Sequence, residues 1–225
     1  GDGRLDIVAG DSDNANKIYF NPSPDEEDKD YGEFYFGQVT CDGSNPNVRC
    51  FGPDTPQVPD DSTQSIALGD VDNDGDIDIV VGNAKRENFV YFNDGFGNFA
   101  TAAVHNCGNP PDGIHCFGST YGSTQSIALG DFDDDGNLDV VVGNQGQQNV
   151  VYLNKDGSGR FKEEAGQGFG PGTDITFSVA VGDINGDGAP DIFVGNGGKW
   201  SPGHNAIYIN DGEGNFPLSR ARFLE

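Results

Sequence analysis

The chain has 225 residues, of which 37 are acidic and 12 are basic, and its formal net charge is -25. Such a charge repels nucleic acid phosphates and anionic lipid surfaces and favours cations as partners, and no apolar run approaches the roughly 20 residues of a membrane-spanning helix. With 35 glycines, 12 prolines and a hydrophobic fraction of 34%, the composition predicts a β-protein rich in turns.

Residues 1–51 are expected to form an incomplete first unit of a repeat. Residues 1–10 align with residues 73–82, so the first strand of the unit and the first half of the loop after it are absent. The segment 18–21 supplies a later strand, and an acidic insert at 22–33 replaces the short hairpin of the other units. We expect this insert to be a solvated loop, with a docking element as the alternative.

Three complete units follow, and each has the same order of strands. Their expected bounds are about 52–117, 118–169 and 170–225. The opening strand of each unit alternates large and small side chains, which suits close approach of neighbouring strands near an axis. These opening strands are expected at 66–69, 127–130 and 179–182.

The second strand of each unit is a short β-branched run, which is typical of a strand buried on both faces. The runs are at 79–81, 140–142 and 192–194. Third strands, leading into glycine-rich turns that predict hairpins, are expected at 90–92, 151–153 and 207–209. Fourth strands are expected to start near Phe99, Phe161 and Phe216. The sequence therefore predicts an all-β chain of four-stranded antiparallel blades, forming one β-propeller-like repeat domain over 1–225.

Three units and a fraction are fewer blades than most propellers need to close a ring. We therefore expect a partial propeller or part of a larger one. The missing blades would come from a longer chain, with any leader peptide removed or upstream, or from other copies bound head-to-tail, which can build a filament.

Four cysteines form two pairs of equal spacing, and each pair is followed by Phe-Gly. The pairs are Cys41 with Cys50 and Cys107 with Cys116. The repeated spacing predicts two local disulfides, and disulfides indicate an oxidising, extracellular compartment. Zinc binding is the alternative, but the sequence has no CxxC motif, and His115 beside Cys116 has no counterpart beside Cys50.

An Asp-rich loop follows the opening strand of each complete unit. We call these segments the first Asp loop (70–78), the second Asp loop (131–139) and the third Asp loop (183–191). Oxygen-bearing side chains stand at loop positions one, three, five and nine, a glycine at position six permits a sharp bend, and position seven can add a backbone carbonyl. The expected metal residues are Asp70, Asp72, Asp74, Asp76, Asp78, Asp131, Asp133, Asp135, Asn137, Asp139, Asp183, Asn185, Asp187, Ala189 and Asp191.

Charge favours a bound ion over an empty turn at these loops. Carboxylates confined to one loop repel one another by up to roughly 4 kcal/mol per close pair, and a divalent ion reverses this repulsion. Hard oxygen ligands and a flexible geometry favour Ca²⁺ over zinc, copper or magnesium. We expect about three Ca²⁺ sites that act as structural staples, with weaker binding at the third Asp loop because Asn185 replaces an aspartate.

These loops, together with three Phe-Gly pairs and the segment Gly188-Ala189-Pro190, resemble FG-GAP repeats. The Phe-Gly pairs are at 51–52, 117–118 and 169–170. The sequence is similar to the integrin α-subunit propeller and to the VCBS repeats of secreted bacterial and algal proteins over nearly its whole length. The resemblance implies a propeller, usually seven-bladed, with calcium between the first and second strands of a blade, and roles in adhesion or in presenting other domains. The cysteine pairs and the acidic insert depart from the family pattern.

Together, these features predict an extracellular, calcium-binding structural or adhesive repeat module, such as a segment of a large cell-surface or filament protein. One alternative is a carbohydrate-binding propeller in which Trp200, beside Lys199 and His204, stacks on a sugar; a packing role is the other reading of that tryptophan. Glycans or extracellular proteins would then be partners. A second alternative is the propeller part of a polysaccharide-degrading enzyme. We expect no catalysis, because the sequence has three histidines and no Gly-x-Ser-x-Gly motif, and its paired acids lie in the Asp loops.

Overall fold

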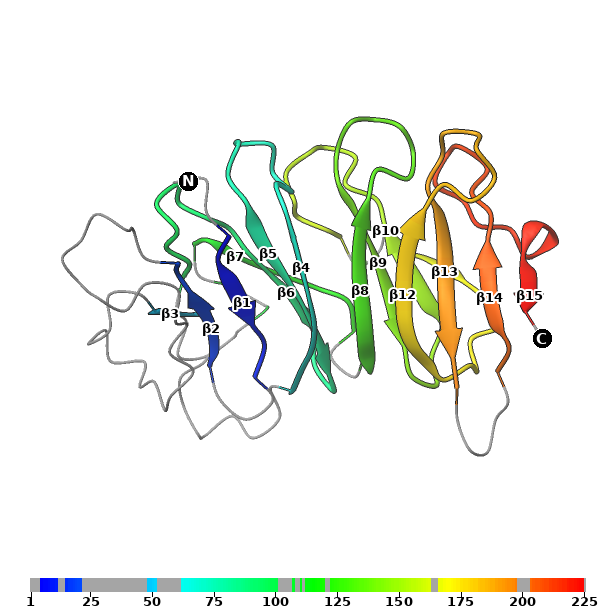
Figure 1. The fold of residues 1–225 in the computed structure, drawn as a ribbon, viewed down its shortest axis with the longest axis horizontal. Helices are drawn as coiled ribbons and strands as arrows, with labels where there is room; N and C mark the ends of the chain where they lie inside the picture. The colour runs from blue at the N-terminus through cyan, green and yellow to red at the C-terminus, as the bar shows by residue number, and fades with distance from the viewer. Residues whose placement is uncertain are drawn as a thin grey trace.

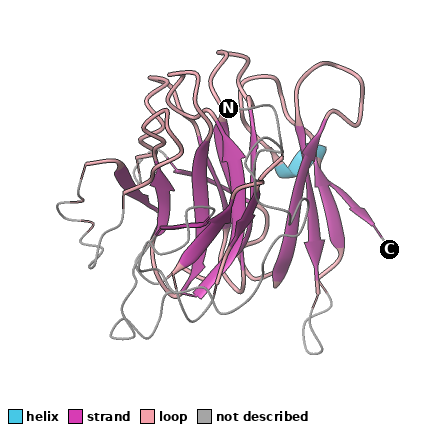
Figure 2. Cartoon of the chain, turned by 60° about the vertical axis from the view of Figure 1, so that its left-hand side comes forward, coloured by secondary structure: helices cyan, strands magenta, loops and turns pink. Residues whose placement is uncertain are grey.

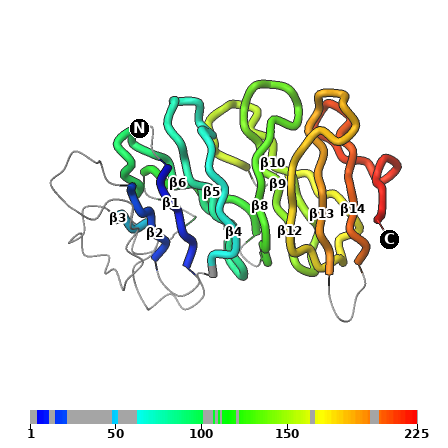
Figure 3. Tube along the Cα trace, in the orientation of Figure 1, coloured from blue at the N-terminus to red at the C-terminus, as the bar shows by residue number. Residues whose placement is uncertain are grey.

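The computed structural model of the chain describes residues 5–11, 15–21, 48–51, 62–100, 107, 110, 112–119, 122–162, 166–197 and 203–224. These residues form four antiparallel sheets that stand side by side in chain order (Figure 1). The Cα trace runs through the row from the N-terminal sheet to the C-terminal sheet (Figure 3). The expected all-β architecture of propeller blades is confirmed, as part of a propeller.

The first sheet has three strands, and each of the other three sheets has four. The strands of the first sheet are β1 (Ile7–Ala9), β2 (Asn16–Tyr19) and β3 (Val48–Phe51). The second sheet contains β4 (Ser62–Gly69), β5 (Asp78–Ala84), β6 (Asn88–Tyr91) and β7 (Ile114–Phe117). The third sheet contains β8 (Thr124–Gly130), β9 (Asp139–Asn144), β10 (Asn149–Tyr152) and β11 (Gly166–Phe169). The fourth sheet contains β12 (Thr176–Gly182), β13 (Asp191–Asn196), β14 (Asn205–Tyr208) and β15 (Arg222–Leu224).

Strands account for nearly all the regular structure of the described residues (Figure 2). One short 3-10 helix, η2 (Leu218–Arg220), precedes β15. Within the described ranges, no helix has the length and apolar character needed to span a bilayer. In the first sheet, β1 occupies the place of a second strand, and no described strand takes the place of the opening strand.

The opening strands β4, β8 and β12 lie next to one another, and each pairs with its second strand through the same irregular register. The shift falls between Thr63 and Ser65 in β4 and recurs at equivalent positions in β8 and β12. Small residues let neighbouring sheets approach closely: a Cβ atom at Gly82 of β5 would lie 2.8 Å from Cγ2 of Thr124 in β8. The second, third and fourth sheets therefore pack closely, each against the next, along their opening strands.

The second strands β5 and β9 are buried on both faces, as their β-branched runs predict, whereas Phe193 of β13 is only partly buried. In β5, Ile79 and Val81 pack with Phe51 of the first sheet, whereas Val80 packs with Ile127 of the third sheet. Because successive side chains of a strand point to opposite faces, one strand contributes to two cores. Three separate cores therefore fill the three gaps between the four sheets.

The expected starts of the fourth strands are wrong. The observed fourth strands begin at Ile114, Gly166 and Arg222 rather than near the phenylalanines that follow the turns. Those phenylalanines instead pack against the Phe-Gly phenylalanines of the preceding sheets. The ring pairs are Phe51 with Phe99 at 6.1 Å, Phe117 with Phe161 at 5.2 Å and Phe169 with Phe216 at 5.8 Å between centroids. Contact between sheets, rather than pairing within a sheet, explains why these positions are aromatic.

Candidate metal centres

The three Asp loops connect the opening strand to the second strand of the second, third and fourth sheets, and all three lie at the same edge of the row (Figure 1). Position nine of each loop is a fully buried aspartate at the start of the second strand: Asp78, Asp139 and Asp191. One oxygen of Asp139 accepts a hydrogen bond of 2.8 Å from the Phe132 backbone N–H, and the other accepts one of 2.7 Å from the Asn154 backbone N–H. Asp78 and Asp191 make the equivalent pairs of bonds.

Position one closes the loop from the other end. The Asp70 carboxylate accepts hydrogen bonds from the Asp74 and Gly75 backbone N–H groups, at 3.1 and 3.0 Å. Gly75 has a φ of 96°, a left-handed conformation that favours glycine. Asp131 and Asp183 accept the same type of bond from Gly136 and Gly188. The loop backbone is thus wrapped around its own carboxylates.

The first and second Asp loops each gather three carboxylates at positions one, three and nine. In each loop, one oxygen from every member lies within 4.8 Å of the others; the groups are Asp70, Asp72 and Asp78, and Asp131, Asp133 and Asp139. Oxygens that share a Ca²⁺ ion at about 2.5 Å can lie up to about 5 Å apart, so this spacing fits a calcium polyhedron. Among the described residues, Oδ1 of Asp72 and Oδ1 of Asp133 are buried without a hydrogen-bond partner. Buried oxygens without partners are what an oxygen-coordinated cation would satisfy.

Burial changes the acidity of these groups. Burial raises the pKa of Asp78 to about 6, although the N–H donors of Asn93 and Val71 act in the opposite direction. The pKa of Asp139 is raised to about 6 for the same reason. Burial also raises the pKa of Asp72, and the neighbouring charge of Asp74 adds to this effect. Each cluster therefore favours bound positive charge, either protons or a cation.

The third Asp loop has a different arrangement. The Asn185 side chain turns toward Asp187: its Nδ2 donates to Oδ2 of Asp187 at 2.9 Å, and its Oδ1 accepts from the Asp187 backbone N–H at 2.8 Å. The carboxylate of Asp183 is exposed and accepts backbone N–H bonds, which lower its pKa. The expected ligands Asp183, Asn185, Asp187, Ala189 and Asp191 thus share one loop, but three carboxylates do not converge in it.

An asparagine that the metal pattern did not include ties the loops together. Asn154 starts the turn after β10. Its Nδ2 donates to the carbonyl of Leu138 in the second Asp loop and, at 2.7 Å, to the carbonyl of Val71 in the first Asp loop. Asn210 makes the same pair of bonds to Pro190 and, at 2.8 Å, to Phe132 in the second Asp loop. An asparagine starts all three turns that follow a third strand, and this recurrence is the sequence signal for the role.

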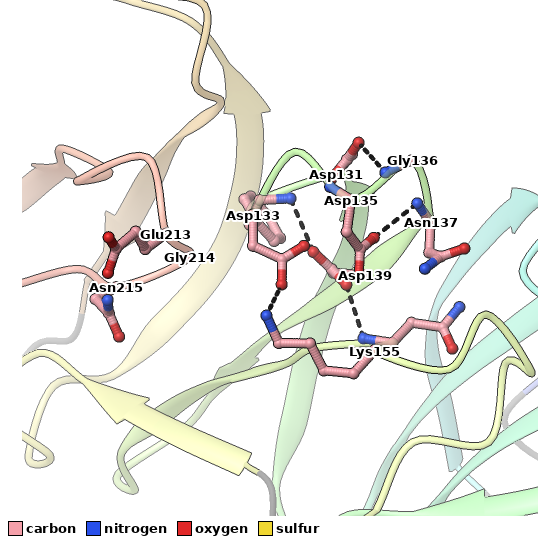
Figure 4. A network of polar contacts seen from close by, with 12 residues as sticks. Asp131, Asp133, Asp135, Gly136, Asn137, Asp139, Lys155, Glu213, Gly214 and Asn215 are labelled. Carbon is pink, nitrogen blue, oxygen red and sulfur yellow. Dashed lines mark hydrogen bonds and ion pairs between the residues drawn. The ribbon is translucent and has the colours of Figure 1, made fainter.

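A lysine contacts the second Asp loop. Lys155 reaches from the turn after β10 and forms an ion pair with Oδ2 of Asp133 (Figure 4). This pairing raises the pKa of the Lys155 ammonium, and the nearby charges of Asp135 and Asp139 add to the effect. No local pattern predicts this contact, since the two residues are 22 positions apart.

The other predicted site residues are the four cysteines and Trp200, and the structure describes only part of them. Cys107 and Cys116 form a disulfide, as expected, and His115 hydrogen-bonds the Phe161 carbonyl, so this pair is not a zinc site. Cys50 is also disulfide-bonded, whereas Cys41 lies outside the described residues. Trp200 lies outside them too, and its contact with a glycan stays a prediction.

The comparisons with known proteins agree with this geometry. A family model described as FG-GAP-like repeat matches residues 70–142 and 131–194, which together make up more than half of the chain. Cartilage acidic protein 1 of Xenopus tropicalis is 29% identical over 147 residues, which are 64% of this chain and 21% of that protein. The Homo sapiens protein of the same name is 28% identical over 135 residues, 59% of this chain and 19% of that protein.

A solved structure shares the fold. The crystal structure of BBS1N in complex with ARL6DN superposes with a TM-score of 0.53 at 15% identity, and the match covers 100% of this chain and 55% of that chain. Identity this low supports the fold alone. The chain spans about a fifth of the length of the curated relatives that it matches. On the match of the family model, with the repeated Asp loops in their expected places between strands, the chain belongs to the FG-GAP-like repeat family.

Proposed function

We propose that this chain is an extracellular, non-catalytic repeat module in which Ca²⁺ stabilises a row of propeller blades. The observation that carries the proposal is the pair of carboxylate clusters in the first and second Asp loops, each with a buried oxygen that lacks a partner. Bound Ca²⁺ would supply the positive charge that, among the described residues, the first cluster lacks and that Lys155 supplies only in part at the second. The described aspartates serve to hold the loops and to bind the ion, so we assign them no catalytic role.

Residues of three kinds would hold the ion in each loop. Carboxylates at positions one, three and nine come from the observed clusters, and the side chain at position five, Asp74 or Asp135, lies on the same loop. The backbone carbonyl at position seven would come from Asp76 or Asn137. The third Asp loop offers Asp183, Asn185, Asp187, Asp191 and the carbonyl of Ala189, and it would bind more weakly because it has one carboxylate fewer.

Calcium binding is tested directly by isothermal titration calorimetry. The natural protein should bind Ca²⁺ at the first and second Asp loops, and Asp72→Asn and Asp133→Asn should each remove one binding event. Asp94→Asn is the matched control, because Asp94 is an exposed aspartate of a neighbouring turn that accepts a hydrogen bond from the Phe96 N–H. Chelation should lower the melting temperature by about 10 °C or more. Absence of binding heat together with an unchanged melt would refute the proposal.

The extracellular assignment has support from the cysteines and from the relatives. The disulfide between Cys107 and Cys116 and the bonded state of Cys50 suit an oxidising compartment. The curated relatives bear the name cartilage acidic protein, and this chain has a net charge of -25. Mass spectrometry of the protein from its native source should find both cysteine pairs oxidised; free thiols would place it in a reducing compartment.

The fourth sheet suggests the kind of partner. The hydroxyl of Ser65 accepts the Ile127 N–H of the next sheet, and that of Ser126 accepts the Val179 N–H, at 3.0 and 3.1 Å. Ser178 is the equivalent residue of β12, and Phe177 beside it is exposed. We propose that another blade of the same repeat type covers this face, supplied by a longer chain or by a second copy bound head-to-tail.

Sedimentation separates these two sources of the extra blade. Growth of oligomers with concentration, abolished by Phe177→Asp, would identify a second copy. A monomer at all concentrations would favour a longer chain, and in that case adding one further repeat after residue 225 should protect Phe177 from solvent. Exposure of Phe177 in both experiments would contradict the docking of a blade.

A further inference from the structure

The turn after β10 differs from the other two turns that follow a third strand. Each turn starts with an asparagine whose Oδ1 accepts the N–H of a downstream glycine; the pairs are Asn93 with Gly97, Asn154 with Gly159, and Asn210 with Gly214. In the turns after β6 and β14, the glycine comes four residues after the asparagine, whereas Gly159 comes five residues after Asn154. The turn after β10 thus contains one additional residue.

The additional residue is Lys155. Each turn also contains an aspartate that accepts the N–H of the residue two positions later. These aspartates are Asp94, Asp156 and Asp211. In the first and third of these turns the aspartate follows the asparagine directly, whereas Lys155 stands between Asn154 and Asp156. The bonds that join Asp94 to Asn98 and Asp211 to Asn215 have no counterpart at Asp156 among the described residues. Gly157 and Gly159 nevertheless keep the positive φ of the corresponding glycines in the other two turns, so the insertion adds a cationic side chain while both bends of the turn remain.

This side chain points at the second Asp loop. The Lys155 ammonium pairs with Oδ2 of Asp133, whose side chain is 3% exposed, while Oδ1 of Asp133 is buried and has no partner (Figure 4). The turn of the fourth sheet covers the same aspartate, since a Cβ atom at Gly214 would lie 3.4 Å from Cβ of Asp133. Among the described residues, no lysine or arginine forms an ion pair with a carboxylate of the first Asp loop.

We infer that Lys155 is an internal competitor for the divalent cation at the second Asp loop, and this inference rests on the proposed calcium function. An ammonium and a Ca²⁺ ion on one carboxylate repel each other, so each weakens the binding of the other. The Lys155 side chain is 63% exposed, so it can swing into solvent. The second Asp loop therefore binds Ca²⁺ more weakly than the first, and it keeps a compensating charge when calcium is absent.

Two backbone amides report on the two sites separately. Gly75 and Gly136 hold position six of the first and second Asp loops, and each donates its N–H to the aspartate at position one. In ¹⁵N-resolved NMR titrations with CaCl₂, the Gly136 signal of the natural protein should reach its midpoint at a higher free Ca²⁺ concentration than the Gly75 signal. Lys155→Gln should lower the Gly136 midpoint by about twofold to fivefold and leave that of Gly75 unchanged, as expected for removal of one partly exposed ion pair.

Lys162→Gln is the matched control. Lys162 follows the same turn, has the same exposed fraction of 63%, and pairs at 3.6 Å with Asp156, which lies outside the Asp loops. This change removes the same charge from the protein and should shift neither midpoint. An unchanged Gly136 midpoint in Lys155→Gln, or an equal shift in both variants, would overturn the competition. If neither glycine responds to millimolar Ca²⁺ in the natural protein, the proposed function fails, and the competition fails with it.

Thermal melts provide a second readout that a merely structural lysine would not give. In calcium-depleted buffer, Lys155→Gln should lower the melting temperature, because the second Asp loop loses its only paired cation among the described residues. In saturating Ca²⁺, the melting temperature of the variant should equal or exceed that of the natural protein. A decrease of the same size under both conditions would show a structural contact and would contradict the inference.

Discussion

The second and third Asp loops have matching spacing but different surroundings. Phe132, at position two of the second Asp loop, is 1% exposed, and its carbonyl accepts a bond from Asn210 of the fourth sheet. Ile184 holds the same position in the third Asp loop and is 51% exposed. In the described part of the chain, no sheet packs beyond the fourth one. The comparison shows that burial of position two comes from the sheet that follows, whereas the aspartate at position nine is buried in all three loops.

Truncating the side chain at position two should give the largest difference in unfolding free energy between the second and third Asp loops. Phe132→Ala removes a ring that packs edge-on against Phe216, with 5.5 Å between centroids, and should cost about 3–5 kcal/mol of unfolding free energy. Ile184→Ala removes a half-exposed side chain and should change the unfolding free energy by less than about 0.5 kcal/mol. Urea denaturation in saturating Ca²⁺ measures both. Equal losses would mean that Ile184 is covered in solution, for example by another blade.

The bonds between loops should have a smaller effect. Asn154→Ala removes the two bonds that its buried amide donates and the one that it accepts from the Gly159 N–H. It also leaves the buried carbonyl of Val71 without its donor, so it should cost about 2 kcal/mol. Asn93→Ala is the control. Asn93 likewise accepts bonds within its turn, but among the described residues its amide donates to Ile77 of the same sheet and to no other sheet, so this change should cost about 1 kcal/mol. The same denaturation experiment compares them. A greater loss for Asn93 than for Asn154 would contradict a role for these bonds in joining sheets.

Features that repeat locally could be predicted from the sequence. The order of the strands and the places of the Asp loops follow from residue types at fixed offsets, and the structure puts those loops between strands. The fourth strands could not be placed, because Phe99 and its equivalents look like the start of a strand but pack between sheets. The contacts of Asn154 with Val71 and of Lys155 with Asp133 depend on how distant segments stack. Local pattern carries no information about such long-range register.

The pH dependence of the calcium-free protein compares the first and second Asp loops with the rest of the chain. The pKa values of Asp78 and Asp139 are raised to about 6, above the ordinary 3.8 of an aspartate, because both side chains are buried. A group whose pKa is higher in the folded state stabilises that state fully below its unfolded pKa, and the contribution is lost as the pH rises through the folded pKa. In calcium-depleted buffer, stability should therefore fall between about pH 4 and about pH 6.

Differential scanning calorimetry between about pH 4.5 and about pH 7 should show the melting temperature of the calcium-free protein falling by several degrees. The exposed Asp94 and Asp183 have lowered pKa values, so their contribution changes below about pH 4 and does not affect this interval. Saturating Ca²⁺ should reverse the trend, because ionised carboxylates bind the ion and protons compete with it. A melting temperature that rises with pH without calcium would mean that Asp78 and Asp139 are already ionised at acidic pH, and that burial does not set their affinity for cations.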